Sequence, residues 1–321
     1  MDALLSLGFD LGGTQVRAAL VQGGRVLKRA ALRTDVSGGP EAVMRQFLTL
    51  AIEVTEGVSS RPQAVGIAAP GPLDTIAGVV DHIPTLPGWE EFPLRARLSE
   101  LLNLPAVVEN DGIAAAYGEW QYGAGRGVSN MVFATVSTGL GGGVIADGRL
   151  LHGRRGMAAH IGHFRMAIDG PICSCGGKGC FEAFAAGTAL GKRAQVVAGA
   201  KLHSYIGQIA VAETVTSRHV VEGARTGDAA CLALLEEEAR FLGIGFTSLA
   251  HIFSPERIVM GGGVSLAFDL LSDTIHATIR AEAMAPFKST PVVPALLGDN
   301  AGLVGAARLA LSNLTTSAEV P

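Results

Sequence analysis

The run Leu4-Leu5-Ser6-Leu7-Gly8-Phe9 leads directly into Asp10-Leu11-Gly12-Gly13-Thr14 near the start of the chain. A short apolar run that stops at glycines is typical of a buried β-strand. Val16 to Val21 continues as a second strand, and Gly23-Gly24 predicts a hairpin turn. The sequence therefore places an acidic residue and a glycine turn at the end of a buried strand.

The rest of the chain alternates between strand and helix signals. Apolar spacing predicts helices over 40–56, 92–102 and 111–122, and buried strands over 64–69 and 106–108. The second half begins with strand signals over 131–137 and 143–151, and Asp147-Gly148 in the second of these predicts a two-residue hairpin turn. Later segments are helices from about residue 184, over 228–252 and over 265–285, a strand over 257–260, and a closing helix over 302–311. No low-complexity linker separates the halves, so we expect two α/β lobes rather than tethered domains.

The composition indicates a folded protein with a large core. Of the 321 residues, 48% are hydrophobic and 17% charged, which excludes bulk disorder, collagen and coiled coil. The net charge of −4 argues against a basic surface for nucleic acid. The first residues do not form a signal peptide, and the longest uncharged run is too polar for a membrane helix. We therefore expect a cytoplasmic protein with reduced thiols and no membrane partner.

Three predicted strands end in glycine clusters: 10–14, 137–143 and 261–263. Glycine lets backbone N–H groups approach an anion closely, and Ser137, Thr138 and Thr14 add hydroxyl donors. Asp10 can hold Mg²⁺ or its water. The Walker pattern is absent, so a P-loop enzyme is excluded. The clusters favour phosphate binding, with simple tight turns as the alternative for each.

One histidine and three cysteines have the composition of a metal site: His163, Cys173, Cys175 and Cys180. One imidazole and three thiolates make a closed tetrahedral zinc site, which is structural because no ligand position stays open. The spacing is not that of a standard zinc finger, so reduced and partly buried cysteines are the alternative. Cys231 lies in a helix-like run and is expected to be a buried apolar residue.

The order of four motifs resembles the ROK family of sugar kinases and related repressors. The motifs are Asp10 to Thr14, Glu109-Asn110-Asp111, Ser137 to Gly143, and Cys173 to Glu182. The resemblance covers about residues 7–310. It implies the actin/hexokinase-like ATPase fold, with two ribonuclease-H-like lobes and a cleft between them. It divides the chain into an N-terminal lobe, 1–112, on which helix 301–321 packs back, and a C-terminal lobe, 113–300, that carries the zinc loop.

By this resemblance the protein binds ATP with Mg²⁺ and holds a structural Zn²⁺. The implied nucleotide-binding residues are Asp10, Gly12, Gly13, Thr14, Ser137, Thr138, Gly139, Gly261 and Gly262. The implied sugar-binding residues are Gly71, Thr85, Asn110, Asp111, His160, His163 and Glu182. His163 would face the sugar while ligating zinc, together with Cys173, Cys175 and Cys180.

Asp111 is the expected catalytic residue. Taken from spacing alone, it would cap the helix that follows it. In the family the matching aspartate takes the proton from the attacking sugar hydroxyl, and the transfer otherwise needs positioning and charge neutralisation. Asn110 can both donate to and accept from hydroxyls, which suits a sugar.

His160 departs from the family pattern. Most relatives carry Glu-x-Gly-His before the cysteine loop, whereas this chain reads His160-Ile161-Gly162-His163. A similar string occurs in bacterial N-acetylmannosamine kinases, so the expected reaction is phosphorylation of the 6-hydroxyl of N-acetylmannosamine. For the substrate, the alternatives are those of a glucokinase or an N-acetylglucosamine kinase. For His160, the alternative is that it only packs beneath the sugar loop.

A transcriptional repressor of the same family is the main non-enzyme alternative. Such repressors carry a helix-turn-helix before the first glycine loop, and only nine residues precede Asp10 here. We therefore expect sugar and ATP as partners, with no nucleic acid. The family commonly forms dimers, which implies a homodimer.

Overall fold

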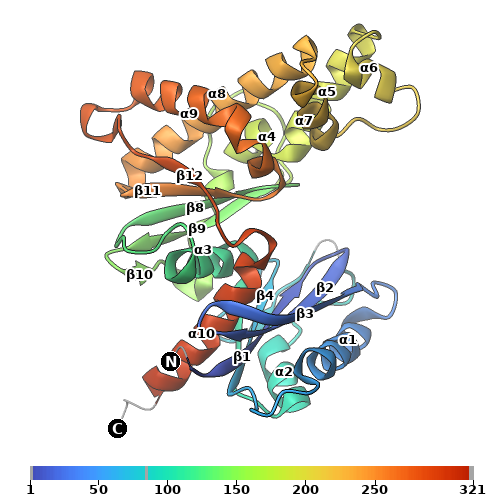
Figure 1. Ribbon diagram of the computed structural model, residues 1–321, viewed down its shortest axis with the longest axis vertical. Coiled ribbons are helices and arrows are strands. Elements are labelled where there is room, and N and C mark those ends of the chain that lie inside the picture. The colour runs from blue at the N-terminus through green and yellow to red at the C-terminus, as the bar shows by residue number, and fades with distance from the viewer. Residues whose placement is uncertain (1–2, 84–85, 318–321) are drawn as a thin grey trace. The chain divides into compact units, whose positions relative to one another are not determined.

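The computed structural model describes residues 3–83 and 86–317 (Figure 1). The chain groups into two compact units: unit 1 comprises 1–127, 149–159 and 296–321, and unit 2 comprises 128–148 and 160–295. The expected lobe boundary at residue 112 falls in the first turn of α3 (Asp111–Tyr122), which groups with unit 1 as a whole. The division into functional lobes stays a prediction.

Unit 1 is built on a five-stranded sheet with the order β3-β2-β1-β4-β7. The strands are β1 (Leu5–Leu11), β2 (Gln15–Gln22), β3 (Arg25–Arg33), β4 (Ala64–Ala69) and β7 (Ala106–Asn110). β1 pairs antiparallel with β2 and parallel with β4, and β4 pairs parallel with β7. All residues of β1 and β4 are buried, as their continuous apolar runs predict. A separate two-stranded ribbon is formed by β5 (Leu73–Asp74) and β6 (Val79–Val80).

Helices cover both faces of this sheet. In Figure 1, α1 (Gly39–Thr55) and α2 (Leu94–Leu102) lie on one face and α10 (Ala301–Ser317) lies on the other. The core beneath α1 and α2 includes Phe9, Phe47 and Trp89, each with at most 1% of its surface exposed. A Cβ at Gly66 would lie 1.9 Å from the carbonyl oxygen of Ala306, so glycine permits the close approach of α10.

Unit 2 repeats this plan. Its strands are β8 (Met131–Val136), β9 (Leu140–Ala146), β11 (Arg257–Gly261) and β12 (Val292–Pro294). β10 (Arg149–Leu150), which begins a segment grouped with unit 1, pairs with β9 and completes the order β10-β9-β8-β11-β12. In chain order, both sheets therefore run third, second, first, fourth, fifth. Its helices are α4 (Phe181–Ala185), α5 (Gly187–Ala200), α6 (Tyr205–Ile209), α7 (Ser217–Arg225), α8 (Ala229–Phe253) and α9 (Phe268–Glu282). In Figure 1, α8 and α9 lie along one face of this sheet.

Within residues 3–83 and 86–317, five short segments of 3₁₀-helix join the larger elements. They cover residues 154–156, 161–163, 263–267, 285–287 and 298–300. Among the described residues, no helix is long and apolar enough to cross a membrane.

Buried Glu119 fixes the end of α3 to the segment that begins at Leu296. Its side chain is fully buried, and its carboxylate accepts backbone N–H bonds from Ala124 (2.7 Å), Leu296 (3.1 Å) and Leu297 (2.6 Å). A buried carboxylate is tolerated when several donors satisfy it. The Glu119 side chain thereby links the segment around Ala124 to the segment around Leu296 and Leu297. Each segment lies close to a boundary of unit 1.

Most of the predicted elements are confirmed, with shifted ends. The hairpin turn predicted at Asp147-Gly148 is confirmed, and it joins β9 to β10. The helix predicted over 265–285 starts with the 3₁₀ turn 263–267 and ends at Glu282. Helices α6 and α7 were not predicted. Cys231 is fully buried, as expected.

Candidate functional site

The corner between β7 and α3 carries Asn110 and Asp111. Asn110 ends β7, and its Oδ1 accepts the N–H groups of Gly112 (3.1 Å) and Ile113 (3.4 Å), so it is the N-cap of α3. The predicted alternative role of Asp111 as the cap is wrong. Asp111 is the first helical residue, where its Oδ1 accepts the Gly112 N–H at 2.7 Å and its side chain is exposed. A helix N-terminus favours a negative charge, and an exposed carboxylate there is accessible to a proton donor.

Gly71 brings a second backbone segment close to this corner. A Cβ at Gly71 would lie 3.7 Å from Asn110 Nδ2. Because Asn110 Oδ1 is used by the cap, its Nδ2 amide is the group left to bind a ligand hydroxyl as a donor. Thr85, the remaining sugar-binding candidate of this part of the chain, lies outside the described residues.

The turn from β1 to β2 contains Asp10, Gly12, Gly13 and Thr14. Its backbone is fixed by the Gly12 N–H, which donates to the Gln15 carbonyl at 2.9 Å. Asp10 is nearly buried, and burial raises the pKa of its carboxyl, although Arg17 acts in the opposite direction. Arg17 donates to Asp10 Oδ2 from both Nε and Nη2. This pairing offsets the negative charge that would otherwise repel a phosphate from the turn.

The corresponding turn of unit 2 joins β8 to β9. Ser137 and Thr138 are exposed, and the Ser137 N–H donates to the Gly139 carbonyl at 2.9 Å. The carbonyls of this turn receive donors from α5, with the Gly187 N–H on Ser137 at 2.7 Å. Since its carbonyls are occupied, the turn presents N–H and hydroxyl donors, which is the chemistry that a phosphate requires.

Gly261 ends β11, and Gly262, which follows it, packs against the end of β8 where the same turn begins. Gly262 has φ = +86°, and a Cβ there would lie 2.4 Å from the Val136 carbonyl oxygen. Only glycine fits this approach without strain. The structure therefore brings Ser137, Thr138 and Gly139 together with Gly261 and Gly262 within unit 2, whereas Asp10 to Thr14, Gly71, Asn110 and Asp111 belong to unit 1.

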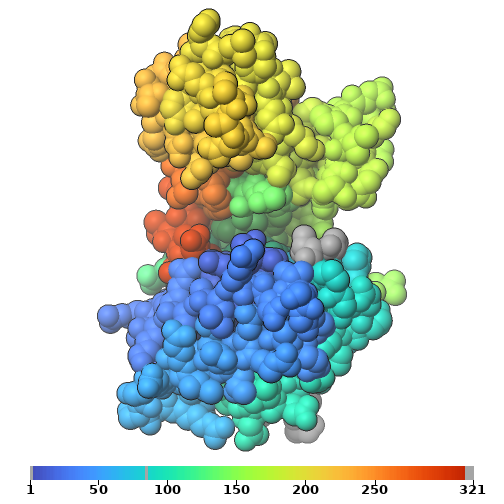
Figure 2. Space-filling view, turned by 90° about the vertical axis from the view of Figure 1, so that its right-hand side faces the viewer, coloured from blue at the N-terminus to red at the C-terminus, as the bar shows by residue number. Residues whose placement is uncertain are grey.

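His163, Cys173, Cys175 and Cys180 converge as a potential metal site, with one donor atom from each within 4.8 Å of the others. Cys175 Sγ lies 3.7 Å from Cys180 Sγ, and Cys173 Sγ lies 3.6 Å from His163 Nδ1. Ligands about 2.3 Å from a tetrahedral Zn²⁺ lie about 3.8 Å apart, so the donor set fits that ion. In Figure 2 the yellow-green segment that carries this loop stands out from the yellow helices of unit 2.

The thiols of this cluster differ in burial. Burial raises the pKa of Cys173, and it raises that of Cys180 to about 12, whereas a backbone hydrogen bond from Gly177 lowers that of exposed Cys175. Buried thiols of this kind keep their protons unless a cation replaces them. It is the convergence of its four donor atoms that gives the cluster the composition of a metal site.

Glu182 connects this loop to the β8–β9 turn. It lies in the first turn of α4, two residues after the N-cap Cys180. Its Oε2 accepts the Leu140 N–H at 2.9 Å, and its Oε1 accepts the Ser174 hydroxyl. His160 is exposed in the same unit, and its ring lies 6.3 Å from that of His163 at an interplanar angle of 27°. His160, His163 and Glu182 thus share unit 2 with the metal-ligand cluster.

Several charged residues around the corner escaped the sequence analysis. Buried Glu109 accepts the Asn110 N–H at 2.8 Å, and its other oxygen lies 2.9 Å from His152 Nε2. Arg155 pairs with Asp74 and Asp81. A single carboxylate inside an apolar strand is the signal that could have singled out Glu109, but no local pattern indicates His152.

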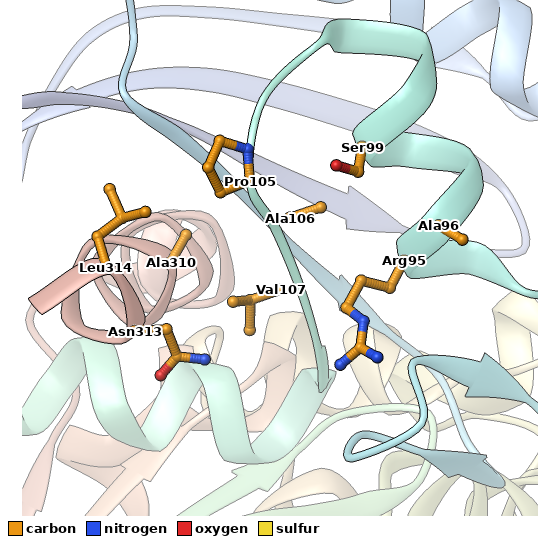
Figure 3. A pocket seen from close by; sticks show the side chains of 9 residues that line it. All are labelled: Arg95, Ala96, Ser99, Pro105, Ala106, Val107, Ala310, Asn313 and Leu314. Atoms are coloured by element: carbon orange, nitrogen blue, oxygen red, sulfur yellow. The ribbon is translucent and has the colours of Figure 1, made fainter. Parts of the chain in front are cut away.

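A cavity of about 400 Å³ lies at the other end of β7 (Figure 3). It is lined by α2, the start of β7 and α10, including Arg95, Pro105, Val107 and Leu314. Val107 comes three residues before Asn110, which is about 10 Å along a strand. The cavity is therefore separate from the corner that carries Asn110 and Asp111.

Two sheets with one strand order, each with a glycine turn after its first strand, define the actin/hexokinase-like class of ATPase folds. A solved ROK family glucokinase from Streptomyces griseus, in complex with glucose and AMPPNP, matches this chain with a TM-score of 0.84 at 36% identity; the match covers 96% of this chain and 99% of that one. The predicted fold class is confirmed.

The family follows from the sequence comparison. The ROK family model matches residues 6–313, and the chain belongs to the ROK family. A glucokinase of Thermotoga maritima is 36% identical over 313 residues, covering 96% of this chain and 98% of its own. An N-acetylmannosamine kinase of Escherichia coli (strain SE11) is 35% identical over 308 residues, covering 96% of this chain and 98% of its own. The predicted family is confirmed, and relatives with both sugar specificities are about equally similar.

Proposed function

We propose that the protein is an ATP-dependent sugar kinase that phosphorylates the 6-hydroxyl of N-acetylmannosamine. The observation that carries the kinase assignment is the corner between β7 and α3, where Asn110 takes the capping role and leaves the Asp111 carboxylate exposed at the helix N-terminus. The relatives, which include glucokinases and N-acetylmannosamine kinases, support hexose kinase activity. The alternative substrates are glucose and N-acetylglucosamine, and the glucokinase relatives favour glucose.

The chain's own residues divide the work of the reaction. Asp111 accepts the proton of the 6-hydroxyl as the oxygen forms its bond to phosphorus, and Asn110 Nδ2 donates to a neighbouring sugar hydroxyl. ATP with Mg²⁺, when bound, supplies the γ-phosphoryl group, and ADP leaves with the electrons of the broken P–O bond. The Gly12-Gly13-Thr14 turn, the Ser137-Thr138-Gly139 turn and Gly261-Gly262 would bind the nucleotide. Asp10 would lie beside Mg²⁺ or its water.

The cluster of His163, Cys173, Cys175 and Cys180 would hold a structural Zn²⁺. The ion would supply no chemistry to the reaction, because four protein ligands leave no open position. The ion would fix the positions of sugar-binding residues. His163 is itself expected to face the sugar, and Cys180 lies two residues before Glu182. Glu182, fixed by Leu140 and Ser174, would bind the anomeric side of the sugar.

His160 carries the choice of N-acetylmannosamine over glucose. A carboxylate at this position could only accept hydrogen bonds, whereas a neutral imidazole also donates one. The axial amide at C2 of N-acetylmannosamine offers a carbonyl acceptor that glucose lacks. A site built around such a hydrogen bond discriminates against a sugar that leaves the donor unpaired.

A coupled assay of ADP release over N-acetylmannosamine, N-acetylglucosamine, glucose and mannose tests the proposal. We expect kcat/KM to be highest for N-acetylmannosamine, and His160→Glu to narrow or invert that ranking by about 1–3 kcal/mol. His203→Glu, an exposed histidine elsewhere in unit 2, is the matched control and should keep the ranking. Glucose as the best wild-type substrate would refute the sugar assignment but leave the kinase intact. No sugar-dependent ADP release would refute both.

A further inference from the structure

The corner that presents Asp111 rests on a buried carboxylate. Glu109 is only 2% exposed and lies at the end of β7, where its register with Ala68 of β4 is fixed. One carboxylate oxygen accepts the N–H of Asn110 at 2.8 Å, and the other lies 2.9 Å from His152 Nε2. A carboxylate so deeply buried is costly unless both oxygens have donors. His152 is therefore needed to satisfy Glu109.

His152 reaches this corner from a segment that is itself well fixed. The His152 carbonyl accepts the Ala158 N–H at 3.0 Å. Three residues after His152, Arg155 donates to Asp74 at 2.7 Å and to Asp81 at 2.9 Å. The His152 ring is 44% exposed, and its hydrogen bond to Glu109 raises its pKa. The ring is thus held by its backbone against Glu109 rather than being a freely moving surface side chain.

The contacts of Glu109 lead directly to the catalytic candidates. Glu109 holds the backbone N–H of Asn110, and Asn110 Oδ1 holds the N–H groups of Gly112 and Ile113. Asp111 lies between these bonded groups, so its position depends on all of them. A displacement of the Glu109 carboxylate by a few tenths of an ångström would move the backbone that carries both Asn110 Nδ2 and the Asp111 carboxylate.

We propose that His152 is a positioning residue for phosphoryl transfer: by donating to buried Glu109 it fixes the corner from which Asn110 and Asp111 meet the sugar. This inference rests on the proposed kinase function. His152 needs no positive charge for this role, because a neutral imidazole with its proton on Nε2 also donates. A neutral amide in the same place should therefore substitute for it.

Kinetics of four variants test the inference: His152→Ala, His152→Gln, Glu109→Gln, and the double variant His152→Ala/Glu109→Gln. In His152→Ala we expect kcat to fall about tenfold or more, with a raised KM for the sugar and an unchanged KM for ATP, because a buried carboxylate oxygen is left without a donor. His152→Gln should recover most of the loss. In the Glu109→Gln background, removal of His152 should cost much less, because no buried charge is left unpaired. His203→Ala is the control for loss of an exposed histidine.

Two comparisons separate positioning from folding. A defect that only lowers the folded fraction would reduce apparent kcat and leave both KM values unchanged. Amide hydrogen exchange at Gly112 and Ile113 should accelerate in His152→Ala and return towards wild type in His152→Gln, whether or not a substrate is known. A His152→Ala protein with wild-type kinetics and exchange, or a His152→Gln protein as impaired as His152→Ala, would overturn the inference. Wild-type protein without sugar-dependent ADP release refutes the proposed function instead, and the exchange measurement still decides the role of His152.

Discussion

The β7–α3 corner and the loop from His163 to Glu182 are stabilised differently. The corner lies between a paired strand and a packed helix, whereas the loop contains a cluster of potential metal ligands. The corner is held by the pairing of β7 with β4 over five residues and by the side-chain acceptors of Glu109 and Asn110. In addition, α3 packs on α10 so closely that a Cβ at Gly305 would lie 1.7 Å from the Ala114 carbonyl oxygen. The loop has main-chain hydrogen bonds of its own, including the isolated bridges Arg165 with Cys180 and Ile172 with Lys178, and in addition a cluster of potential metal ligands. We therefore expect the corner to keep its geometry without any ligand, and the loop to lose order when the proposed Zn²⁺ is removed.

The largest expected effect is that of Asp111→Asn on catalysis. The substitution removes the proton acceptor and keeps the size of the side chain, so we expect kcat to fall by about 10²–10⁴-fold. The melting temperature should hardly change, because the cap of α3 belongs to Asn110 and not to Asp111. Steady-state kinetics and thermal unfolding of the same preparation check this. Activity within a few-fold of wild type would exclude Asp111 as the base.

Loss of one cysteine should affect stability and sugar binding together. Cys175→Ser removes a ligand whose side chain is exposed, so it creates no cavity in the core. We expect wild-type protein to contain about one zinc per chain and the variant to contain much less. The variant should unfold at a lower temperature, and its KM for the sugar should rise, because the same loop holds His163 and Glu182. Elemental analysis that finds no zinc in active wild-type protein would contradict the assignment.

The sequence predicts the strand, turn and helix of the corner better than it predicts the side-chain contacts that support them. The strand, the turn and the order Asn110-Asp111 are local features, and local hydrogen bonds fix them. The capping residue was nevertheless misplaced by one position, because asparagine and aspartate are equally suited to cap a helix and only the backbone decides between them. The partnership of Glu109 with His152 joins residues 43 positions apart, and no periodicity reports such a contact.

In unit 2 the convergence of His163, Cys173, Cys175 and Cys180 could be predicted, because Cys and His at short spacing are typical of metal sites. The missed helix α7 shows the opposite case. Its start at Thr216 is stabilised by His219, whose Nδ1 accepts the Thr216 N–H at 3.2 Å. The usual sequence signature has Glu or Gln at that position, so the pattern did not match.

The smallest expected effect is that of Glu238→Gln on the pH dependence of stability. Glu238 supports the C-terminal end of α4 through Arg193. The N-cap of α4 is Cys180, and the carbonyl of Phe184 near its C-terminus accepts a hydrogen bond from Arg193, which pairs with fully buried Glu238. Burial raises the pKa of Glu238 to about 7, although Arg193 acts in the opposite direction. This buried pair is a second anchor for α4 that does not depend on metal.

The raised pKa of Glu238 determines whether the free energy of unfolding rises or falls with pH. Between about pH 4.5 and pH 7 the folded protein keeps a proton on Glu238 that the unfolded chain has lost, so this group lowers the free energy of unfolding by up to about 1.4 kcal/mol for each unit that the pH rises. Glu238→Gln should remove this contribution, so the variant should lose less stability than wild type as the pH rises. Urea unfolding across this pH range measures it, with Glu236→Gln as the exposed control. Equal slopes for wild type and Glu238→Gln would mean that Glu238 keeps its charge throughout, held by Arg193 alone. The ion pair would then anchor α4 at every pH in that range. The order of the loop from His163 to Glu182 would in that case depend on the proposed Zn²⁺ and not on pH through Glu238.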